Sequence, residues 1–321
     1  MRKIIFSIAA ISLLATTSFS HVSLLKNGKS STSQQDFKLE KVNGNVYALF
    51  GRGGNIGVSY GEDGLMTIDT QFANIAAQIK AELKKLGTDK PKFIFNTHFH
   101  GDHTGGNGIF GQDGTIIAHY NVRERLLSTV DREGKPQEPA PKAALPSITY
   151  KQGLSVFFNG EEVKAVHFKS GHTDGDTAIF FTGSNVVHLG DDFFVGRFPF
   201  VDLASGGSVQ GLIKNVGKMI GMIPSDAKII PGHGPVSGVQ DLMEYRSMLI
   251  ETTTIVRKHM KEGKTLDQIK AAGFPAKYKD AGSGFINQDR WIETIHKSYS
   301  NSMKKGDKMK KKIVKKVVEK P

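Results

Sequence analysis

Four side chains that can bind a metal are crowded into one short stretch, FNTHFHGDHTGGN (residues 95–107). His98, His100, Asp102 and His103 lie within six positions of one another. A lone His is usually a satisfied polar residue, but neighbouring imidazoles repel each other when protonated and gain little from packing when neutral. A divalent cation favours such crowding, because neutral imidazole and carboxylate are ligands of zinc and iron. The stretch therefore predicts a metal site.

Three further candidate ligands occur downstream, each beside a glycine. They are His172 in SGHTDGD, Asp191 in VVHLGDD and His233 in IIPGHGP. Each follows an apolar or β-branched run, which predicts a buried strand, and loops at strand ends carry function more often than strand interiors do. Glycine allows a sharp turn and leaves room around an ion. We expect these residues to complete the site.

The elements that must position these residues follow a repeated order. Alternating or apolar runs predict strands within 37–51, 55–70, 92–100, 115–120, 154–168, 177–192 and 227–235. Helical spacing covers 73–87, 121–130, 208–223 and most of 238–300. The Pro-rich segment 131–149 predicts a surface loop. The order of strands then helix, repeated twice, indicates sheets flanked by helices.

In this order, THFHGDHTGG, GHTDGD, LGDD and PGHG resemble the motifs of the metallo-β-lactamase-fold superfamily of hydrolases, over about residues 37–240. The resemblance implies an α+β fold, a four-layer αβ/βα sandwich with two metals in a cleft at the sheet edges, here with a C-terminal helical extension. The implied ligands are His98, His100 and His172 for one metal, Asp102, His103 and His233 for the other, and Asp191 between them.

The resemblance also implies the chemistry of such a centre. It implies two Zn²⁺ per chain, although Fe or Mn suits the same donors. A hydroxide shared by the metals would attack the substrate, and Asp102 would orient it and pass a proton to the leaving group. Asp69, at the end of the strand LMTID, is expected to hydrogen-bond to a ligand imidazole, with a plain turn role as the alternative. The sequence does not identify residues that bind the substrate.

The identity of the ligand residues narrows the range of reactions that the resemblance allows. One lactam-cleaving subclass has Cys where this chain has Asp191, and this chain has no Cys. Another such subclass lacks the bridging acid, and flavodiiron relatives have Glu in place of His100. The ligand set looks like that of thioesterases, phosphodiesterases and lactonases. We expect a zinc-dependent hydrolase that cleaves an ester, thioester, lactone or amide bond of a small molecule, with β-lactams among the candidates.

Two other functions remain open at this point. An iron-dependent sulfur (persulfide) dioxygenase on the same fold would use bound iron. A protein that binds anionic surfaces would use the Lys-rich segment 303–321, in which nine Lys outnumber Asp307 and Glu319, a net +7. This segment and the first residues carry most of the chain's net charge of +12, so we expect no nucleic-acid partner. Weak contact with an anionic membrane or polymer remains a hypothesis.

Other conspicuous residues receive more ordinary interpretations. His188 lies mid-strand and is expected in the core or beside a ligand, and His119 and His167 are expected to be structural. GRGGN, residues 51–55, predicts a hairpin tip that overhangs the site, because it lacks the strand–loop–helix context and the Lys of a phosphate loop. Arg197 is a candidate contact for an anionic substrate, with a structural role as the alternative.

The chain is expected to divide into five segments. MRKIIFSIAAISLLATTSFS, residues 1–20, has the form of a cleavable signal peptide and predicts a periplasmic or secreted protein, with an uncleaved anchor as the alternative. We expect a flexible leader over 21–36, a catalytic domain over 37–240, C-terminal helices packed on it over 241–302, and a disordered tail over 303–321. The oligomeric state is not predicted.

Overall fold

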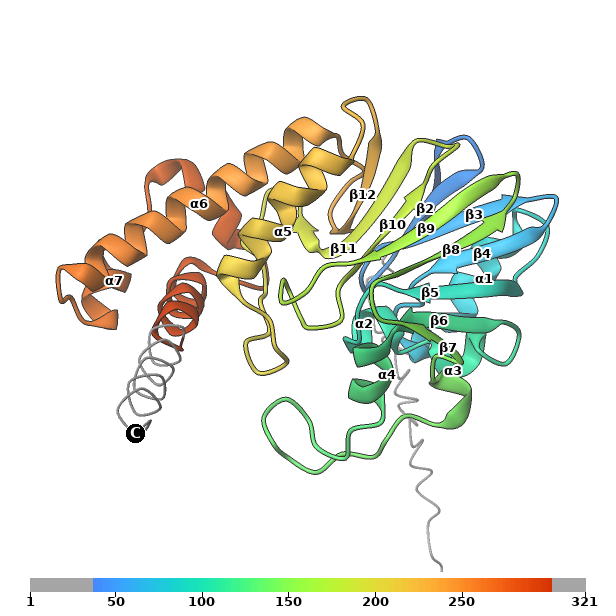
Figure 1. Cartoon of the computed structure of the whole chain (residues 1–321), viewed down its shortest axis with the longest axis horizontal. Coiled ribbons are helices and arrows are strands. Elements are labelled where there is room, and N and C mark those ends of the chain that lie inside the picture. Colours follow the sequence, from blue (N-terminus) through green and yellow to red (C-terminus); the bar gives the residue numbers. More distant parts are fainter. Residues whose placement is uncertain (1–36, 302–321) are drawn as a thin grey trace, which may run out of the picture. The chain divides into compact units, whose positions relative to one another are not determined.

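A computed structural model describes residues 37–301. The predicted signal peptide, the leader and the Lys-rich tail lie outside the described residues. In the described part, two sheets pack face to face, and helices lie against the outer side of each (Figure 1). No helix between residues 37 and 301 combines the length and the apolar character that crossing a membrane requires.

The first sheet has seven strands that neighbour one another in chain order. They are β1 (Lys38–Asn43), β2 (Val46–Phe50), β3 (Ile56–Gly61), β4 (Gly64–Ile68), β5 (Pro91–Asn96), β6 (Thr115–His119) and β7 (Ile148–Tyr150). The strands β1 to β4 form an antiparallel meander, whereas β4 to β7 are parallel. Parallel strands end at the same edge, so the segments after β4 and β5 are brought side by side there.

Helices form the crossovers of this sheet. They are η1 (Ala73–Ile75) and α1 (Ala76–Lys84) before β5, α2 (Gly101–Thr104) and α3 (Asn107–Phe110) before β6, and α4 (Tyr120–Leu126) and η2 (Lys142–Ala144) before β7. The helix predicted over 121–130 therefore ends earlier than expected, at Leu126. Ser128 accepts from the backbone amide of Val130, and such local bonds compete with helical ones.

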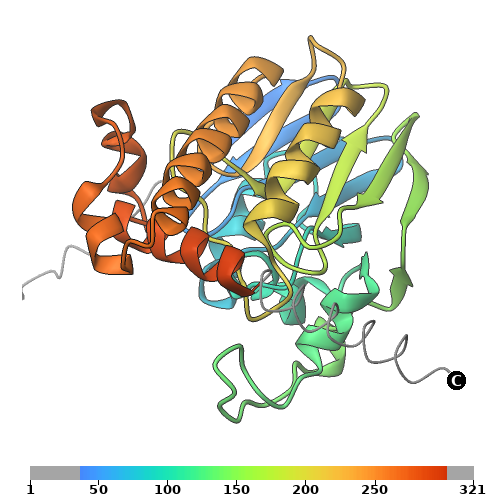
Figure 2. The same cartoon turned by 60° about the vertical axis from the view of Figure 1, so that its left-hand side comes forward.

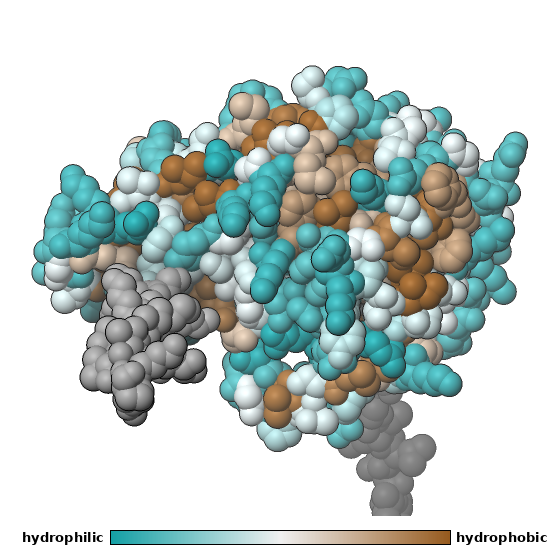
Figure 3. All heavy atoms as spheres, viewed as in Figure 1, coloured by the Kyte–Doolittle hydropathy of each residue, from teal (hydrophilic) through white to brown (hydrophobic). Residues whose placement is uncertain are grey.

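The second sheet has five strands in the order β12-β11-β10-β9-β8. They are β8 (Gly153–Phe158), β9 (Glu161–His167), β10 (Thr177–Phe181), β11 (Val186–Phe194) and β12 (Lys228–His233). The strands β11 and β12 are parallel and are joined through α5 (Val209–Met222), whereas the other pairs are antiparallel. The outer face of β8 is open to solvent: Phe157 is 81% exposed, and apolar side chains gather in this region in Figure 3.

Alternation along the strands separates three apolar layers. In β5, Phe95 packs between the two sheets and Ile94 packs against α1 and α3. The same division holds for Met66 and Leu65 in β4. A third layer fills the space between the second sheet and the helices that follow it. Three apolar layers define a four-layer sandwich, so the predicted fold class is confirmed.

The C-terminal helices share the third layer with the second sheet. They are α6 (Val239–Lys261), α7 (Leu266–Ala272), η3 (Ala276–Tyr278), η4 (Asp280–Ser283) and a helix over 288–301. Figure 2 shows α5 and α6 side by side over the second sheet. Trp291 is fully buried, and its indole N–H donates to Thr252 on α6 at 3.0 Å. One apolar cluster therefore joins β11, α5 and residues 288–301.

The Pro-rich segment 131–149 departs from its prediction at its end. Residues 148–150 form β7, which pairs with the end of β6 at the edge of the first sheet. Pro146 lies shortly before this strand, and a proline restricts the residue that precedes it to extended conformations. The rest of the segment is a loop beside the carboxyl ends of the first sheet, apart from η2.

Candidate metal centre

The segment after β5 places four of the candidate ligands. His98 leaves the buried end of the strand, and His100 is the N-cap residue of α2. The single turn of α2 brings His103 back, because its amide donates to the His100 carbonyl at 3.0 Å. Asp102, in the first turn of α2, is partly exposed, with 29% of its side chain accessible.

The second sheet supplies the remaining candidates. His172 lies in the loop between β9 and β10, Asp191 lies on β11, and His233 ends β12. The parallel pairing of β11 with β12 brings the last two side by side, with a register shift at Gly190, whose φ is +52°. Gly232 must lack a side chain, because a Cβ there would lie 2.1 Å from Asp191 Oδ1.

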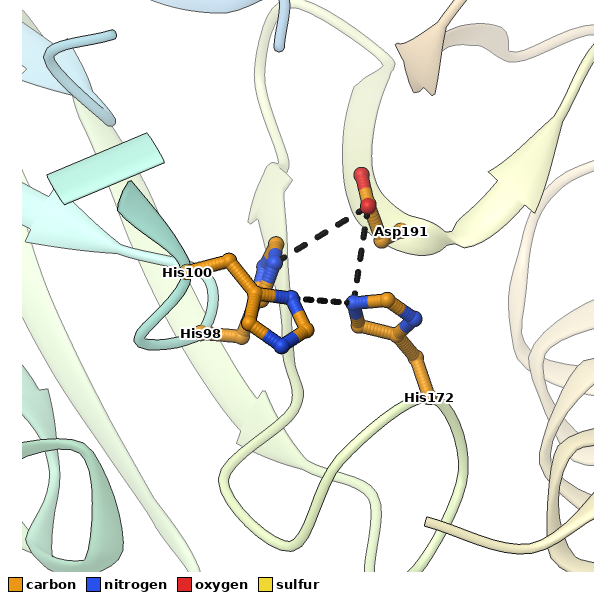
Figure 4. Close-up of side chains that lie close together, drawn as sticks. All are labelled: His98, His100, His172 and Asp191. Atoms are coloured by element: carbon orange, nitrogen blue, oxygen red, sulfur yellow. Dashed lines mark hydrogen bonds and ion pairs between the residues drawn. The ribbon is translucent and has the colours of Figure 1, made fainter. Parts of the chain in front are cut away.

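The structure brings all seven predicted residues together in two groups. His98, His100, His172 and Asp191 have ligand atoms within 4.8 Å of one another, and so do Asp102, His103 and His233 (Figure 4 shows the first group). The two groups meet at Asp191, which faces both.

Each oxygen of Asp191 faces a different group. Its Oδ2 lies 3.4 Å from His172 Nε2 and 3.9 Å from His98 Nε2. Its Oδ1 lies 3.0 Å from His103 Nε2 and 3.4 Å from His233 Nε2. A carboxylate in this orientation can hold one cation with each oxygen, which is the arrangement expected of a bridging ligand.

Hydrogen bonds at the far side of each ring fix which nitrogen faces the cluster. His98 Nδ1 donates to Thr97 Oγ1 at 3.1 Å, and His172 Nδ1 donates to the Phe200 carbonyl at 2.7 Å. His103 Nδ1 donates to Asp69 Oδ2 at 2.7 Å. These rings therefore present Nε2. Such outer partners set the tautomer and orientation of a ligand imidazole.

His100 is turned the other way and has a partner that the sequence did not reveal. Its Nε2 donates to Asp202 Oδ2 at 3.0 Å, so Nδ1 faces His172 Nε2 at 2.8 Å. Asp202 Oδ1 also accepts from the amides of Ala204 and Ser205. Burial opposes ionisation of Asp202, but the bonds from His100 and Ser205 lower its pKa to about 2. In the sequence, Asp202 is a single Asp in the loop after β11 and carries no signal of this role.

Asp69 lies where it can orient a ligand ring. It is fully buried, and besides its contact with His103 it accepts from the amide and the hydroxyl of Thr97. Its φ of +70° is a left-handed conformation that non-glycine residues rarely adopt, and such outliers gather at functional sites. One carboxylate thereby connects the segments that carry His98 and His103.

Unpartnered atoms test whether the centre fits a cation. His98 Nε2, His103 Nε2 and Asp191 Oδ1 are buried and make no hydrogen bond of good geometry, although the last two lie 3.0 Å apart. Leaving such an atom buried and unsatisfied costs about 1–3 kcal/mol. These three atoms face one another across the cluster, where a divalent cation would satisfy them together. The donor set of imidazoles and carboxylates fits zinc, iron and manganese.

The ionisation states of His98, His172 and Asp191 suit metal binding. Burial lowers the pKa of His172 to about 4 and holds that of His98 well below its ordinary value. Burial opposes ionisation of Asp191, yet the facing His103, His233 and His172 hold its pKa well below its usual value. Neutral imidazole and ionised carboxylate are the forms that metals bind.

The glycine-rich hairpin tip 51–55 lies against the second group. The Gly54 amide donates to the Asp102 carbonyl at 3.1 Å, and the Asn55 amide donates to the Gly232 carbonyl at 2.8 Å. A Cβ on Gly54 would lie 2.1 Å from His103 Cε1, so glycine is needed for this close approach. The tip overhangs the site, as its sequence suggested.

The other buried histidines have backbone partners and lie in neither ligand group. His188 Nε2 donates to the Asn55 carbonyl at 3.0 Å, and its Nδ1 accepts from the Gly190 amide. His119 and His167 stack on each other with ring centroids 3.7 Å apart. Arg197 is exposed and lines a cavity beside the ligands.

Comparisons with known proteins agree with this fold. Hydroxyacylglutathione hydrolase of Synechococcus sp. (strain JA-2-3B'a(2-13)) is 32% identical over 122 residues, which cover 38% of this chain and 42% of that protein. The chain thus spans less than half of this relative's length. The structure of DIM-1 metallo-beta-lactamase aligns with a TM-score of 0.55 at 18% identity, over 67% of this chain and 98% of that one.

A second solved structure extends further along the chain. The sec-alkylsulfatase Pisa1 from Pseudomonas sp. aligns with a TM-score of 0.62 at 15% identity, over 82% of this chain and 50% of that one. At such identities, the likeness shows the fold alone. The family model of the metallo-beta-lactamase superfamily matches residues 49–233, which include every candidate ligand. With its sandwich of sheets and its ligand order, the chain belongs to the metallo-beta-lactamase superfamily.

Proposed function

We propose that this protein is a zinc-dependent hydrolase that holds two Zn²⁺ per chain and cleaves an ester, thioester, lactone or amide bond of a small molecule. The observation that carries the proposal is the orientation of Asp191, whose two oxygens face two separate groups of ligand atoms. Curated relatives named as hydroxyacylglutathione hydrolases support the class of reaction. β-Lactams are among the candidate substrates.

The residues of the centre have distinct roles in this reaction. When bound, the metal ions lower the pKa of water and polarise the substrate oxygen. Asp102 Oδ2 lies 3.3 Å from His233 Nε2, and the carboxylate also lines the cavity. Burial opposes its ionisation, but His103 and His233 lower the pKa of Asp102, so it is ionised at neutral pH. An ionised carboxylate here accepts a proton from the attacking water and passes it to the leaving group.

His233 connects this carboxylate with the bridging one. Its Nε2 lies 3.3 Å from Asp102 and 3.4 Å from Asp191, and its ring stacks on Phe194. Burial alone would lower the pKa of His233, but the carboxylates of Asp191 and Asp102 raise it to about 9. Without a cation, therefore, a proton occupies this position and balances the two carboxylates. As a metal ligand, His233 would give up this proton and bind in its neutral form.

Metal content of the purified protein is the test. We expect about two zinc ions per chain by elemental mass spectrometry, together with hydrolysis of at least one member of a panel of esters, thioesters, lactones, phosphodiesters and β-lactams. An Asp102→Ala, His172→Ala double variant should lose both metal and activity. An equally soluble His167→Ala variant should keep both, because that ring belongs to neither ligand group.

Other results would contradict the proposal. Bound iron without hydrolysis, and oxygen consumption with a persulfide, would favour the dioxygenase alternative. No stoichiometric metal after growth in metal-replete medium would remove the enzyme proposal. Salt-sensitive binding to anionic vesicles that is lost on truncation after Ser302 would then favour the surface-binding alternative.

We also propose that the protein acts in the periplasm or outside the cell. The support is the sequence of residues 1–20, with a basic start and an apolar run. N-terminal sequencing of the protein from fractionated cells tests this. A mature N-terminus just after residue 18 or 20 in the exported fraction is expected, whereas an intact Met1 in the cytosolic fraction would refute it.

A further inference from the structure

A cavity of about 510 Å³ lies beside the candidate metal centre and is lined by both candidate ligands and apolar side chains. Four candidate ligands line it, namely His100, Asp102, Asp191 and His233. Apolar side chains form much of the remainder, namely Phe72, Phe194, Phe200, Phe285 and Ile286. Cavities of this size and apolar character hold small molecules.

Two of these apolar side chains come from the C-terminal segment. Phe285 and Ile286 follow η4 and lie outside residues 49–233, which the superfamily model matches. The Phe198 amide donates to the Ala281 carbonyl at 2.9 Å, which ties this segment to the loop after β11. The cavity is therefore built jointly by the sandwich and by its C-terminal extension.

Phe285 is held in place, although 69% of it is exposed. Arg290 donates from Nη1 to the Phe285 carbonyl at 2.8 Å, and its guanidinium lies 4.4 Å from the centroid of the Phe285 ring. The ring also meets Phe200 edge-on, with 6.2 Å between centroids. An aromatic ring that is fixed by its neighbours and still faces solvent offers apolar surface to a ligand at little entropic cost.

Arg197 places a positive charge on the same wall. Its side chain is exposed and forms no ion pair or hydrogen bond with another residue of the range 37–301. Its stem packs along residue 284, where a Cβ would lie 3.2 Å from Arg197 Cδ. The other arginine of the cavity, Arg132, is instead paired with Glu133 at 3.3 Å. Arg197 is thus available to an anion.

We propose that residues 284–286 complete the substrate site and that this site takes an organic anion with a bulky apolar group. Phe285 packs against the apolar group, and Arg197 pairs with the anionic group. The inference rests on the proposed hydrolase function, because it assigns the substrate of that same centre. It makes Phe285 and Arg197 residues that determine specificity, and it gives the C-terminal extension a part in substrate recognition.

Straight-chain alkanesulfonates test the assignment by binding alone, because they are anions that the proposed reaction does not cleave. Calorimetric titration of the metal-loaded protein with butane- to decanesulfonate should give an affinity that rises about threefold to fourfold per methylene group. Phe285→Ala should flatten this dependence, and Phe285→Leu should restore most of it. Arg197→Gln should lower the affinity for every sulfonate by a similar factor and leave the dependence of affinity on chain length unchanged.

Phe157→Ala is the matched control, because Phe157 is an exposed Phe on β8 that does not line this cavity. It should bind the series as the wild-type protein does. An affinity independent of chain length, no binding at all, or a Phe285→Ala variant that behaves like wild type would overturn the assignment of Phe285. Unchanged binding by Arg197→Gln would overturn the anion site.

Hydrolysis is measured separately, so that the two proposals fail in different ways. If the protein hydrolyses small esters but the sulfonate series shows no dependence on length, the substrate class is wrong and the hydrolase function stands. If the sulfonates bind as expected but the metal-loaded protein cleaves no ester, thioester, lactone or amide, the hydrolase function is wrong.

Discussion

Two groups of histidines in this molecule differ in what their nitrogens face. In the metal centre, each of His98, His103 and His172 uses one nitrogen for a fixed partner and turns the other towards a shared carboxylate. In the other group, His119 and His167 lie flat on each other, and their bonds run to backbone atoms. Both groups are crowded, and both include buried rings.

The difference teaches that crowding alone does not make a metal site. In the stacked pair, His119 bonds to the Lys151 carbonyl and, as the N-cap of α4, accepts from the Asn121 amide, and His167 Nδ1 bonds to the Asp176 carbonyl. The candidate metal centre leaves His98 Nε2 buried without a hydrogen-bond partner, and His103 Nε2 faces only the carboxylate of Asp191. A cation is favoured where buried ligand atoms converge without hydrogen-bond partners, and not where backbone groups already bond to them.

Loss of a ligand should give the largest contrast between the two groups. His172→Ala is expected to abolish binding of at least one metal ion and to lower kcat/KM by several orders of magnitude, because activation of water depends on the metal. His167→Ala should leave the metal content unchanged. Elemental analysis and kinetics on both variants make the comparison. A His172→Ala protein that retains its full metal content would show that this ring is not a ligand.

A methyl group at the hairpin tip should have the next largest effect. Gly54→Ala would push a Cβ into the His103 ring, which is fully buried and cannot move away freely. We expect the loss of about one metal ion per chain, since a ligand must lie within about 0.2 Å of its ideal distance. Gly101→Ala is the control, because a Cβ there meets nothing within 4 Å. Equal metal content in both variants would contradict the role of the tip.

Removing the charge beside His100 should weaken the centre without destroying it. Asp202→Asn keeps acceptors for the Ala204 and Ser205 amides but removes the carboxylate that orients His100. Zinc affinity, measured by competition with a chelator, should fall about tenfold to a hundredfold. Asp226→Asn, at an exposed site, should have the affinity of wild type. An unchanged affinity in Asp202→Asn would mean that the contact is only structural.

The stacked pair should show the smallest effect, in stability against pH. Burial, together with His167, lowers the pKa of His119 from 6.5 to about 4. Between these values the unfolded chain binds more protons, so stability is lost as pH falls from 6.5 towards 4. His119→Asn can still cap α4 and should remove up to about 2 kcal/mol of this loss. Thermal unfolding of both proteins from pH 7 to pH 4 measures this difference. The same dependence of stability on pH in the wild type and in His119→Asn would refute it.

The fold was largely predictable, because alternation along the strands is a local property of the sequence. Phe95 and Ile94 point to opposite faces of β5 in any sheet, so their apolar character requires cover on both sides. The end of the helix near Leu126 and the short strand β7 were not predictable. They depend on the Ser128 hydroxyl bond and on pairing with the edge of β6, which compete with weak local preferences.

That the candidate ligands bind a metal stays a prediction, but their positions were predictable, because the motifs carry donors at short spacing and lie at predicted strand ends. Asp202 and Phe285 were not. Asp202 meets His100 across 102 positions of the chain, and one Asp in a loop has no pattern of its own. Phe285 enters the cavity wall only because the C-terminal segment folds back onto the loop after β11.

The sequence by itself determined the donor types, their spacing around α2 and the alternation that buries three apolar layers. These follow from side-chain chemistry and from the periods of helix and strand. Only the tertiary structure decided which oxygen of Asp191 faces which group, which nitrogen of His100 faces the cluster, and which C-terminal side chains line the cavity. Those choices depend on the packing of two sheets and a helical extension, since contacts between distant segments have no local signature in the sequence.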